Sequence, residues 1–243
     1  MNPYDALGRW IDAHHGEQVE FLREVVRVPT DMPPGDNAPA AEKTAALLAS
    51  LGFAVERHPV SSEFLRDYGM QSVTNLIMRE RFGDGGPTVA LNAHGDVVPP
   101  GEGWTKPPYD GVIENGRMYA RGVAVSKSDI ATYTYALVAL RALALQGAPR
   151  KGSVELHFTY DEEFGGLAGS AFLLQNKLTR PLRACGELQL RCRHRAQRLP
   201  AARGDGPWQI GPRRDAGNGA RCVSRWNGHT ECDLHRGRRA QVD

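Results

Sequence analysis

The sequence of 243 residues predicts an α/β fold, in which helices flank a mainly parallel sheet. Apolar segments typical of strands alternate along the chain with segments of helical period, and this alternation favours a parallel sheet. The composition, 41% hydrophobic and 24% charged, is that of an ordinary globular protein. The alternation stops near residue 182, so the α/β domain is expected to occupy residues 1–182.

Helical periodicity places the helices. The first spans residues 5–26, where apolar residues recur at helical spacing until Pro29 interrupts the chain. A second helix from about 40 to 51 is followed by Gly52, a residue suited to a helix C-terminus. Further helices are expected over residues 129–145 and 166–178.

Short runs of apolar and β-branched residues place the strands. They fall in the sequences FAVER (53–57), NLIMRE (75–80), TVALNAH (88–94) and SVELHFTY (153–160). The glycine-rich RFGDGGP (81–87) predicts a hairpin between the second and third of these strands. IENGRMYARG (113–122) predicts another hairpin, with Asn115 and Gly116 at its turn.

Two polar clusters follow apolar strands. His94 and Asp96 come at the end of one strand, in VALNAHGDVVPPGEGW, and Asp161, Glu162 and Glu163 follow another, in TYDEEFGG. In open α/β sheets, ligands bind at the carboxyl ends of the strands. A single His-x-Asp or Glu-Glu sequence is more often structural or solvated, but both clusters at one edge predict a site.

Imidazole and carboxylate groups together suit zinc, and clustered carboxylates stay ionised most readily beside a cation. Neighbouring side chains of an extended chain point in opposite directions. One of Glu162 and Glu163 is therefore expected to bind a metal ion while the other faces a bound water. Asp96, two residues after His94, is expected to orient the imidazole.

Three motifs in order, NAHGDVVPPGEGW, PPYDGVIENGRMYARG and YDEEFGG, resemble the cocatalytic zinc amidohydrolases. This family includes aminoacylases, acetylornithine deacetylase, succinyl-diaminopimelate desuccinylase and carboxypeptidase G. The resemblance covers roughly residues 5–180. It implies a zinc exopeptidase-like catalytic domain, interrupted in the family by a small domain that often forms a homodimer. It also implies hydrolysis of an amide next to a carboxylate-bearing group, in a small N-acyl amino acid or peptide substrate.

The resemblance also implies roles for individual residues. His94 resembles a zinc ligand, Asp96 the aspartate that supports it, and Glu163 a ligand of the other zinc ion. Glu162 resembles the general base that takes a proton from the metal-bound water. Zinc lowers the pKa of its water toward ~7, and a carboxylate then carries the proton to the leaving amine.

One departure from the family lies in ARGVAVSKSD (120–129). Val125 stands where family members carry an aspartate that bridges the two metal ions, and valine has no donor atom. Ser126 is a poor zinc ligand, and Asp129 would reach the site only with a rearranged backbone. The sequence therefore leaves open one zinc ion or two. It also leaves open a rival function, in which a non-catalytic descendant of the family binds peptides or metabolites.

Residues 183–243 have a different composition. They hold 13 arginines, no lysine, 6 acidic residues and all four cysteines, whereas residues 1–182 hold 17 basic and 22 acidic residues. No helical or strand period persists there, so this stretch is expected to be a disordered or irregular tail. The later metal ligands of the family are not recognisable in it. The chain is therefore expected to be truncated and to contain only part of the catalytic domain.

Three interpretations of the tail stay open. Its composition is that of a GC-rich gene translated out of frame. Its thirteen arginines could instead contact nucleic acid, although no nucleic-acid motif accompanies them and no such partner is expected. It could also form a small zinc site, for which the candidate ligands are Cys192, His194, His229, Cys232 and His235.

The sequence shows no secretory signal pattern and no apolar run long enough to span a bilayer. A cytoplasmic protein without a membrane partner is therefore expected, and its cysteines are not expected to form disulfides.

Overall fold

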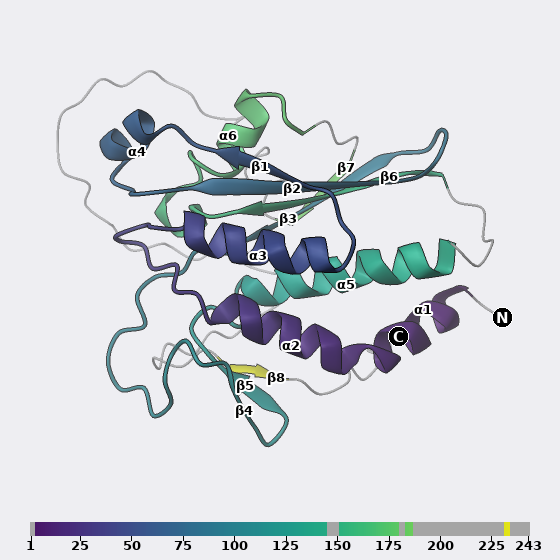
Figure 1. Cartoon of the computed structure of the whole chain (residues 1–243), viewed down its shortest axis with the longest axis horizontal. Helices are drawn as coiled ribbons and strands as arrows, with labels where there is room; N and C mark the ends of the chain where they lie inside the picture. The colour runs from purple at the N-terminus through teal and green to yellow at the C-terminus, as the bar shows by residue number, and fades with distance from the viewer. Residues whose placement is uncertain (1–2, 145–150, 180–182, 187–230, 234–243) are drawn as a thin grey trace, which may run out of the picture.

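The structure is a computed structural model, and it describes residues 3–144, 151–179, 183–186 and 231–233. Its centre is a five-stranded sheet in the order β1-β2-β6-β3-β7 (Figure 1). The strands are β1 (Val55–Pro59), β2 (Thr74–Gly83), β3 (Thr88–His94), β6 (Gly152–Thr159) and β7 (Arg183–Gly186). Strand β2 runs antiparallel to β1 and β6, whereas β3 is parallel to β6 and β7. Four strands therefore run one way and β2 runs the other.

Helices lie on both sides of this sheet. In Figure 1, α2, α3 and α5 lie on one side and α6 on the other. The helices are α1 (Pro3–Ala13), α2 (His15–Val26), α3 (Ala38–Ser50), α4 (Ser62–Tyr68), α5 (Lys127–Ala144) and α6 (Ser170–Gln175), with a 3-10 turn η1 (Glu162–Phe164). None of the helices in the described part of the chain has the length and apolarity needed to cross a bilayer. The α/β class predicted from the sequence is confirmed.

Several elements match their predictions closely. Helix α5, at residues 127–144, matches the predicted helix 129–145 up to residue 144, after which the chain is not described, and Gly52 after α3 adopts a left-handed φ of 79°. The second predicted hairpin is present as β4 (Val112–Glu114) and β5 (Arg117–Tyr119). Asn115 and Gly116 at its turn both have positive φ, as a tight Asn-Gly turn requires.

The first predicted helix is two helices. Residues 5–26 were expected to form one helix, but α1 ends at Ala13 and α2 begins at His15. His14 between them leaves the helical conformation, its ring stacks on Trp10, and its Nδ1 lies 2.7 Å from the Trp10 carbonyl oxygen. The His14 amide still donates to the Trp10 carbonyl at 3.1 Å, so the interruption is confined to one residue, which helical periodicity does not reveal.

The predicted hairpin over residues 81–87 is wrong. Strands β2 and β3 do not pair with each other, because β6 lies between them and pairs with both. Gly85 and Gly86 do adopt positive φ, so the glycine-rich segment is a turn as expected. The turn connects strands that are next to each other in sequence but one strand apart in the sheet.

Two helices differ from expectation in extent. The helix expected over residues 166–178 is present only as α6, because its first residues form turns after η1. Helix α4 was not predicted, although Ser61 caps its N-terminus through the Phe64 amide and Gly69 ends it in a left-handed conformation. Those two residues are the helix signals that could have revealed it.

Regular structure is also present after residue 182. Strand β7 extends the central sheet beside β3, and β8 (Glu231–Asp233) pairs with β5 in a small second sheet. The prediction of an irregular tail therefore does not hold for these two short strands. The candidate tail zinc ligands lie outside the residues whose side chains the structure describes.

The two faces of the central sheet differ in polarity. Residues of the face toward α3 and α5 belong to the hydrophobic core: Leu76, Met78, Ala93, Leu156 and Phe158. Apart from Ile77 and Ala90, alternate residues in the same register are polar: Asn75, Arg79, Asn92, Glu155, His157 and Thr159. The segment around α6 covers this polar face, since Asn75 donates a hydrogen bond to the Ala168 carbonyl and Thr179 donates one to Glu155.

Candidate metal centre

The site begins where β3 and β6 end together. His94 and Thr159 are the last residues of these parallel strands and lie opposite each other in register. The Gly95 amide donates a hydrogen bond to the Thr159 carbonyl at 2.8 Å, which holds the two departing loops side by side. A Cβ at Gly95 would collide with the Tyr160 ring, so this close approach requires glycine.

His94 is oriented by Asp96, and both side chains are fully buried. The imidazole Nδ1 lies 3.0 Å from the Asp96 backbone oxygen and 3.3 Å from its carboxylate Oδ1. The other ring nitrogen, Nε2, lies 4.0 Å from Oε2 of Glu162. Asp96 thus contacts one ring nitrogen, and the other faces the glutamate pair. The two residues lie in contact, and the role of Asp96 in orienting a metal-binding imidazole stays a prediction.

Glu162 and Glu163 approach His94 together. One donor atom each from these three residues lies within 4.8 Å of the other two. The expectation that the two glutamates point in opposite directions is wrong, because residues 162–164 form a 3-10 turn and not an extended segment. Asp96 also contributes here, since its Oδ2 accepts a hydrogen bond from the Glu163 amide at 2.9 Å.

The electrostatics of the cluster favour a cation. Burial is the main reason that the pKa of Glu163 is raised, and the neighbouring carboxylates of Glu162 and Asp96 raise it further. His94 and Arg121 act in the opposite direction. A group whose charged form is disfavoured by burial and by like charges gains most from a positive ion at short range.

The donor set fits zinc. An imidazole nitrogen and carboxylate oxygens are ordinary zinc ligands, each bound at about 2 Å. Two ligands of one ion therefore lie at most about 4 Å apart, so donors already within 4.8 Å of one another need only small side-chain movements. His94, Glu162 and Glu163 are the residues that could hold the ion.

Asp161, the third carboxylate of the predicted cluster, lies apart from it. Its Oδ2 accepts a hydrogen bond from the Ala168 amide at 2.6 Å, and its backbone oxygen accepts from Phe164 and Gly166. The side chain is buried and stabilises the turn that carries the two glutamates. Its position is structural, and it is not part of the group of potential ligands.

The position that departs from the family lies at the site. Val125 is 61% exposed and lines a cavity of about 110 Å³ with Val97, Arg121, Gly122 and Glu163. Asp129, the distant replacement considered from the sequence, accepts a hydrogen bond from Ser126 at 3.0 Å. It is not among the three grouped donors, so the backbone rearrangement that it would need is not present.

Sequence reasoning missed two cationic residues near the site. Lys127 is 1% exposed and donates a hydrogen bond to the Val28 carbonyl at 3.1 Å. Burial lowers the pKa of Lys127 to about 8, against the opposing charges of Asp31 and Asp96. Arg121 lines the cavity, and its Nε donates to the Val98 carbonyl at 2.6 Å. A lysine in the first turn of an otherwise apolar helix is the signal that could have suggested a buried charge.

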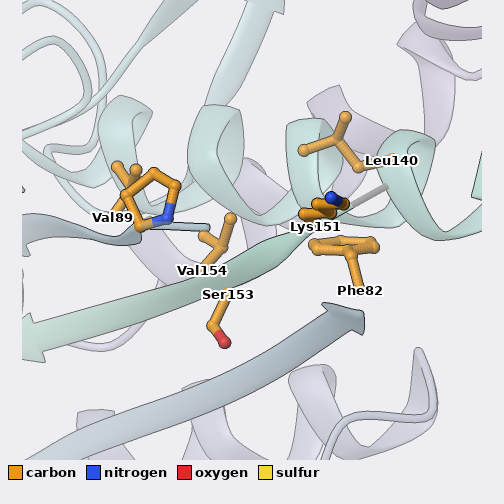
Figure 2. Close-up of a pocket in the computed structure, with 7 residues that line it drawn as sticks. Phe82, Val89, Leu140, Lys151, Ser153 and Val154 are labelled. Carbon is orange, nitrogen blue, oxygen red and sulfur yellow. The ribbon is translucent and has the colours of Figure 1, made fainter. Parts of the chain in front are cut away.

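A second hollow lies away from the metal-capable residues. It has a volume of about 350 Å³ and lies at the opposite ends of β3 and β6, where Val89, Ser153 and Val154 contribute to its wall. Figure 2 shows Leu140 of α5 and Phe82 of β2 near Lys151 in this hollow. Its lining is mostly apolar and has no carboxylate or histidine, so it offers no metal ligands.

Solved structures with a similar fold include several peptidases. The dipeptidase Dug1p of Saccharomyces cerevisiae superposes with a TM-score of 0.58 at 19% identity, over 72% of this chain and 38% of that one. Human carnosine dipeptidase 1 gives a TM-score of 0.53 at 24% identity, over 71% and 38%. The M20 metallo-carboxypeptidase Sso-CP2 of Sulfolobus solfataricus gives 0.54 at 19%, over 69% and 35%. The chain therefore shares the α/β fold of these peptidases over about 70% of its length.

The sequence comparisons agree with this class. Residues 90–205 match the model of peptidase family M20/M25/M40. Succinyl-diaminopimelate desuccinylase of Gluconobacter oxydans is 35% identical over 147 residues, 60% of this chain and 35% of the relative. The Methylobacterium nodulans desuccinylase is 40% identical over 132 residues, 54% of this chain and 31% of the relative. The resemblance of the N-terminal portion to this family is confirmed, and the chain spans about a third of these relatives' length.

The matched range bears on the predicted domain boundary. The family match continues past residue 182 to residue 205, and β7 at residues 183–186 belongs to the central sheet. The division into a partial catalytic domain of residues 1–182 and a tail of 183–243 stays a prediction.

Proposed function

We propose that this chain carries the N-terminal part of a zinc-dependent amidohydrolase that cleaves an amide bond in small N-acyl amino acids or peptides. The observation that carries the proposal is the convergence of His94, Glu162 and Glu163 at the carboxyl ends of β3 and β6. The similarity to desuccinylases and to M20 peptidases supports the same chemistry. The proposal covers zinc as the ion and hydrolysis as the reaction.

His94 and Glu163 would hold the ion, and Asp96 positions both. The Asp96 carboxylate contacts the His94 imidazole through Oδ1 and the Glu163 backbone through Oδ2. Zinc, when bound, polarises the amide carbonyl and lowers the pKa of water in the site. The protein's contribution is to hold the ligands in one place before the ion arrives, which reduces the ordering needed on binding.

Glu162 is the proposed general base and acid. Its side chain is 29% exposed, whereas His94 and Asp96 are fully buried, so its carboxylate can meet both a water molecule and a substrate. Glu162 accepts a proton from the attacking water, whose oxygen forms the new bond to the carbonyl carbon. As the carbon–nitrogen bond breaks, the same carboxylate delivers that proton to the leaving amine.

The substrate class follows from the relatives and not from the cavity. The desuccinylases are named for removing a succinyl group from diaminopimelate, which is an amide hydrolysis. We extend this to N-succinyl and other N-acyl amino acids, with dipeptides as the second group of candidates. The amide next to a carboxylate-bearing group is the feature common to both groups.

Hydrolysis of a panel of N-succinyl amino acids, N-acetyl amino acids and dipeptides tests the proposal. Zinc-loaded protein should release free amine, and a chelator should abolish the release. Glu162→Gln should lower the rate about 10²–10⁴-fold, whereas Glu63→Gln on α4, which is exposed, should have no effect. Hydrolysis that persists in the chelator and in Glu162→Gln contradicts the proposal. Binding of these compounds without hydrolysis supports the rival, a non-catalytic binding protein.

A further inference from the structure

The cavity beside Glu163 has few side-chain groups that could bind a cation. Its other lining residues in the described structure are Val97, Arg121, Gly122 and Val125. The two valines and the glycine provide no side-chain donor for a cation, and Val125 is 61% exposed with its side chain at the cavity. Glu163 is thus the single carboxylate of this wall.

Nearby polar side chains do not supply the missing donors. Ser126 and Asp129 are hydrogen-bonded to each other at 3.0 Å, and this pairing occupies Oδ2 of Asp129. Among the described residues, the potential ligands that come together are His94, Glu162 and Glu163 alone. Protein zinc sites use three or four protein ligands per ion. These residues supply three donors at most, and two when Glu162 acts as the base, so they are too few for two ions.

The charge of the cavity opposes a second cation as well. Arg121 is permanently charged, and its guanidinium is anchored at Nε by the Val98 carbonyl. A dication placed between Glu163 and Arg121 would be repelled by the guanidinium and would gain one carboxylate only.

We infer that the centre binds one cation, and that Val125 closes the position beside Glu163 to a second. The inference rests on the proposed function, because it takes the His94 and Glu163 cluster to be a zinc site. It predicts a mononuclear centre, with Arg121 among the residues that line the cavity beside Glu163. A carboxylate at position 125 should open the second position.

Metal content measured on the full chain tests the inference. The protein is dialysed to equilibrium against zinc, and bound zinc is counted by mass spectrometry for the wild type, Val125→Asp and Val125→Asn. The double variant His94→Asn/Glu163→Gln serves as the blank, since it removes the cluster and leaves any zinc held elsewhere in the chain. Val125→Asn is the matched control, because it has the shape of aspartate without the charge. Thermal unfolding checks that every variant is folded.

The expected counts above the blank are one ion for the wild type, one for Val125→Asn and two for Val125→Asp. A cobalt titration followed by visible absorption should break at the same equivalents. Two ions above the blank in the wild type would overturn the inference and leave the proposed function intact. A Val125→Asp protein with no more zinc than the wild type would also overturn it. A wild type equal to the blank would overturn the proposed function itself.

Discussion

The two faces of the central sheet are stabilised by different kinds of interaction. On the face toward α3 and α5, apolar side chains such as Leu156 and Phe158 pack into one hydrophobic core. On the opposite face, Glu155 and His157 from the same strand are also buried, but they meet polar partners. Apolar packing is non-directional, whereas each buried polar group needs a specific partner.

The difference explains where the site lies. His94 falls in register with the polar face, since it alternates along β3 with Ala93 of the core face. The polar face is therefore a continuous surface from the Glu155–His157 pair to the metal-capable residues at the strand ends. One face of β6 packs into the hydrophobic core, and the other carries buried polar side chains such as Glu155 and His157.

Phe158→Ala tests the apolar face of the sheet and should have the largest effect on stability. The ring is fully buried in the core, so its removal should lower the free energy of unfolding by about 3–5 kcal/mol through lost burial and a cavity. Urea unfolding followed by circular dichroism measures the change. Leu174→Ala on α6, which is exposed, should change it by less than about 0.5 kcal/mol. A loss below about 1 kcal/mol in Phe158→Ala would show that the core repacks.

Glu155→Gln tests the polar face and should lower the free energy of unfolding by about 1–3 kcal/mol. Burial raises the pKa of Glu155, but the hydrogen bond from His157 and the charge of Arg79 outweigh it, so the pKa is lowered. A carboxylate with a lowered folded pKa stabilises the protein above its ordinary pKa and loses that contribution as pH falls. The difference in free energy of unfolding between the wild type and Glu155→Gln should therefore be largest at pH 7 and shrink below about pH 4.5. A difference independent of pH contradicts this account.

Asp96→Asn tests whether the buried carboxylate of Asp96 supports metal binding at the site. The amide keeps the shape but loses the charge that faces His94, so zinc affinity should fall about 10–100-fold. Competition with a coloured chelator gives the dissociation constants. Asp67→Asn, an exposed position, is the matched control and should leave the affinity unchanged. Equal affinities in Asp96→Asn and the wild type would remove Asp96 from its positioning role.

Lys127→Met should change how stability depends on pH, with a defined sign. Burial lowers its pKa to about 8 in the folded protein, whereas the unfolded chain keeps the proton to about pH 10. The unfolded state therefore binds more protons in this window, and stability relative to Lys127→Met should rise with pH from 8 to 10. The slope should be at most about 1.4 kcal/mol per pH unit. Urea unfolding at several pH values measures it, with the exposed Lys151→Met as control. A flat or falling difference contradicts the buried ammonium.

Local patterns predicted much of the molecule. The strand ends that carry His94 and the glutamates could be read from apolar runs that stop at polar residues, and both loops do meet at one edge. The turn at Asn115 and the helix beginning near Asp129 follow from residue preferences over a few neighbours. In each case the determining interactions lie within a short stretch of chain.

Contacts between distant residues could not be predicted in the same way. Strand β6 inserts between β2 and β3, and no feature of the glycine-rich turn between those two strands signals it. The hydrogen bond from the Glu163 amide to Asp96 depends on two loops that the sheet brings together. The 3-10 turn at residues 162–164, which directs both glutamates to His94, is likewise held by Asp161 and its contact to Ala168.

The carboxylate of Asp96 touches both sides of the proposed centre, with one oxygen on the imidazole of His94 and the other on the backbone of Glu163. One buried side chain therefore links the two proposed ligands, although they come from different loops. The folded chain brings their donor atoms within 4.8 Å of each other without an ion, which reduces the ordering that binding would require.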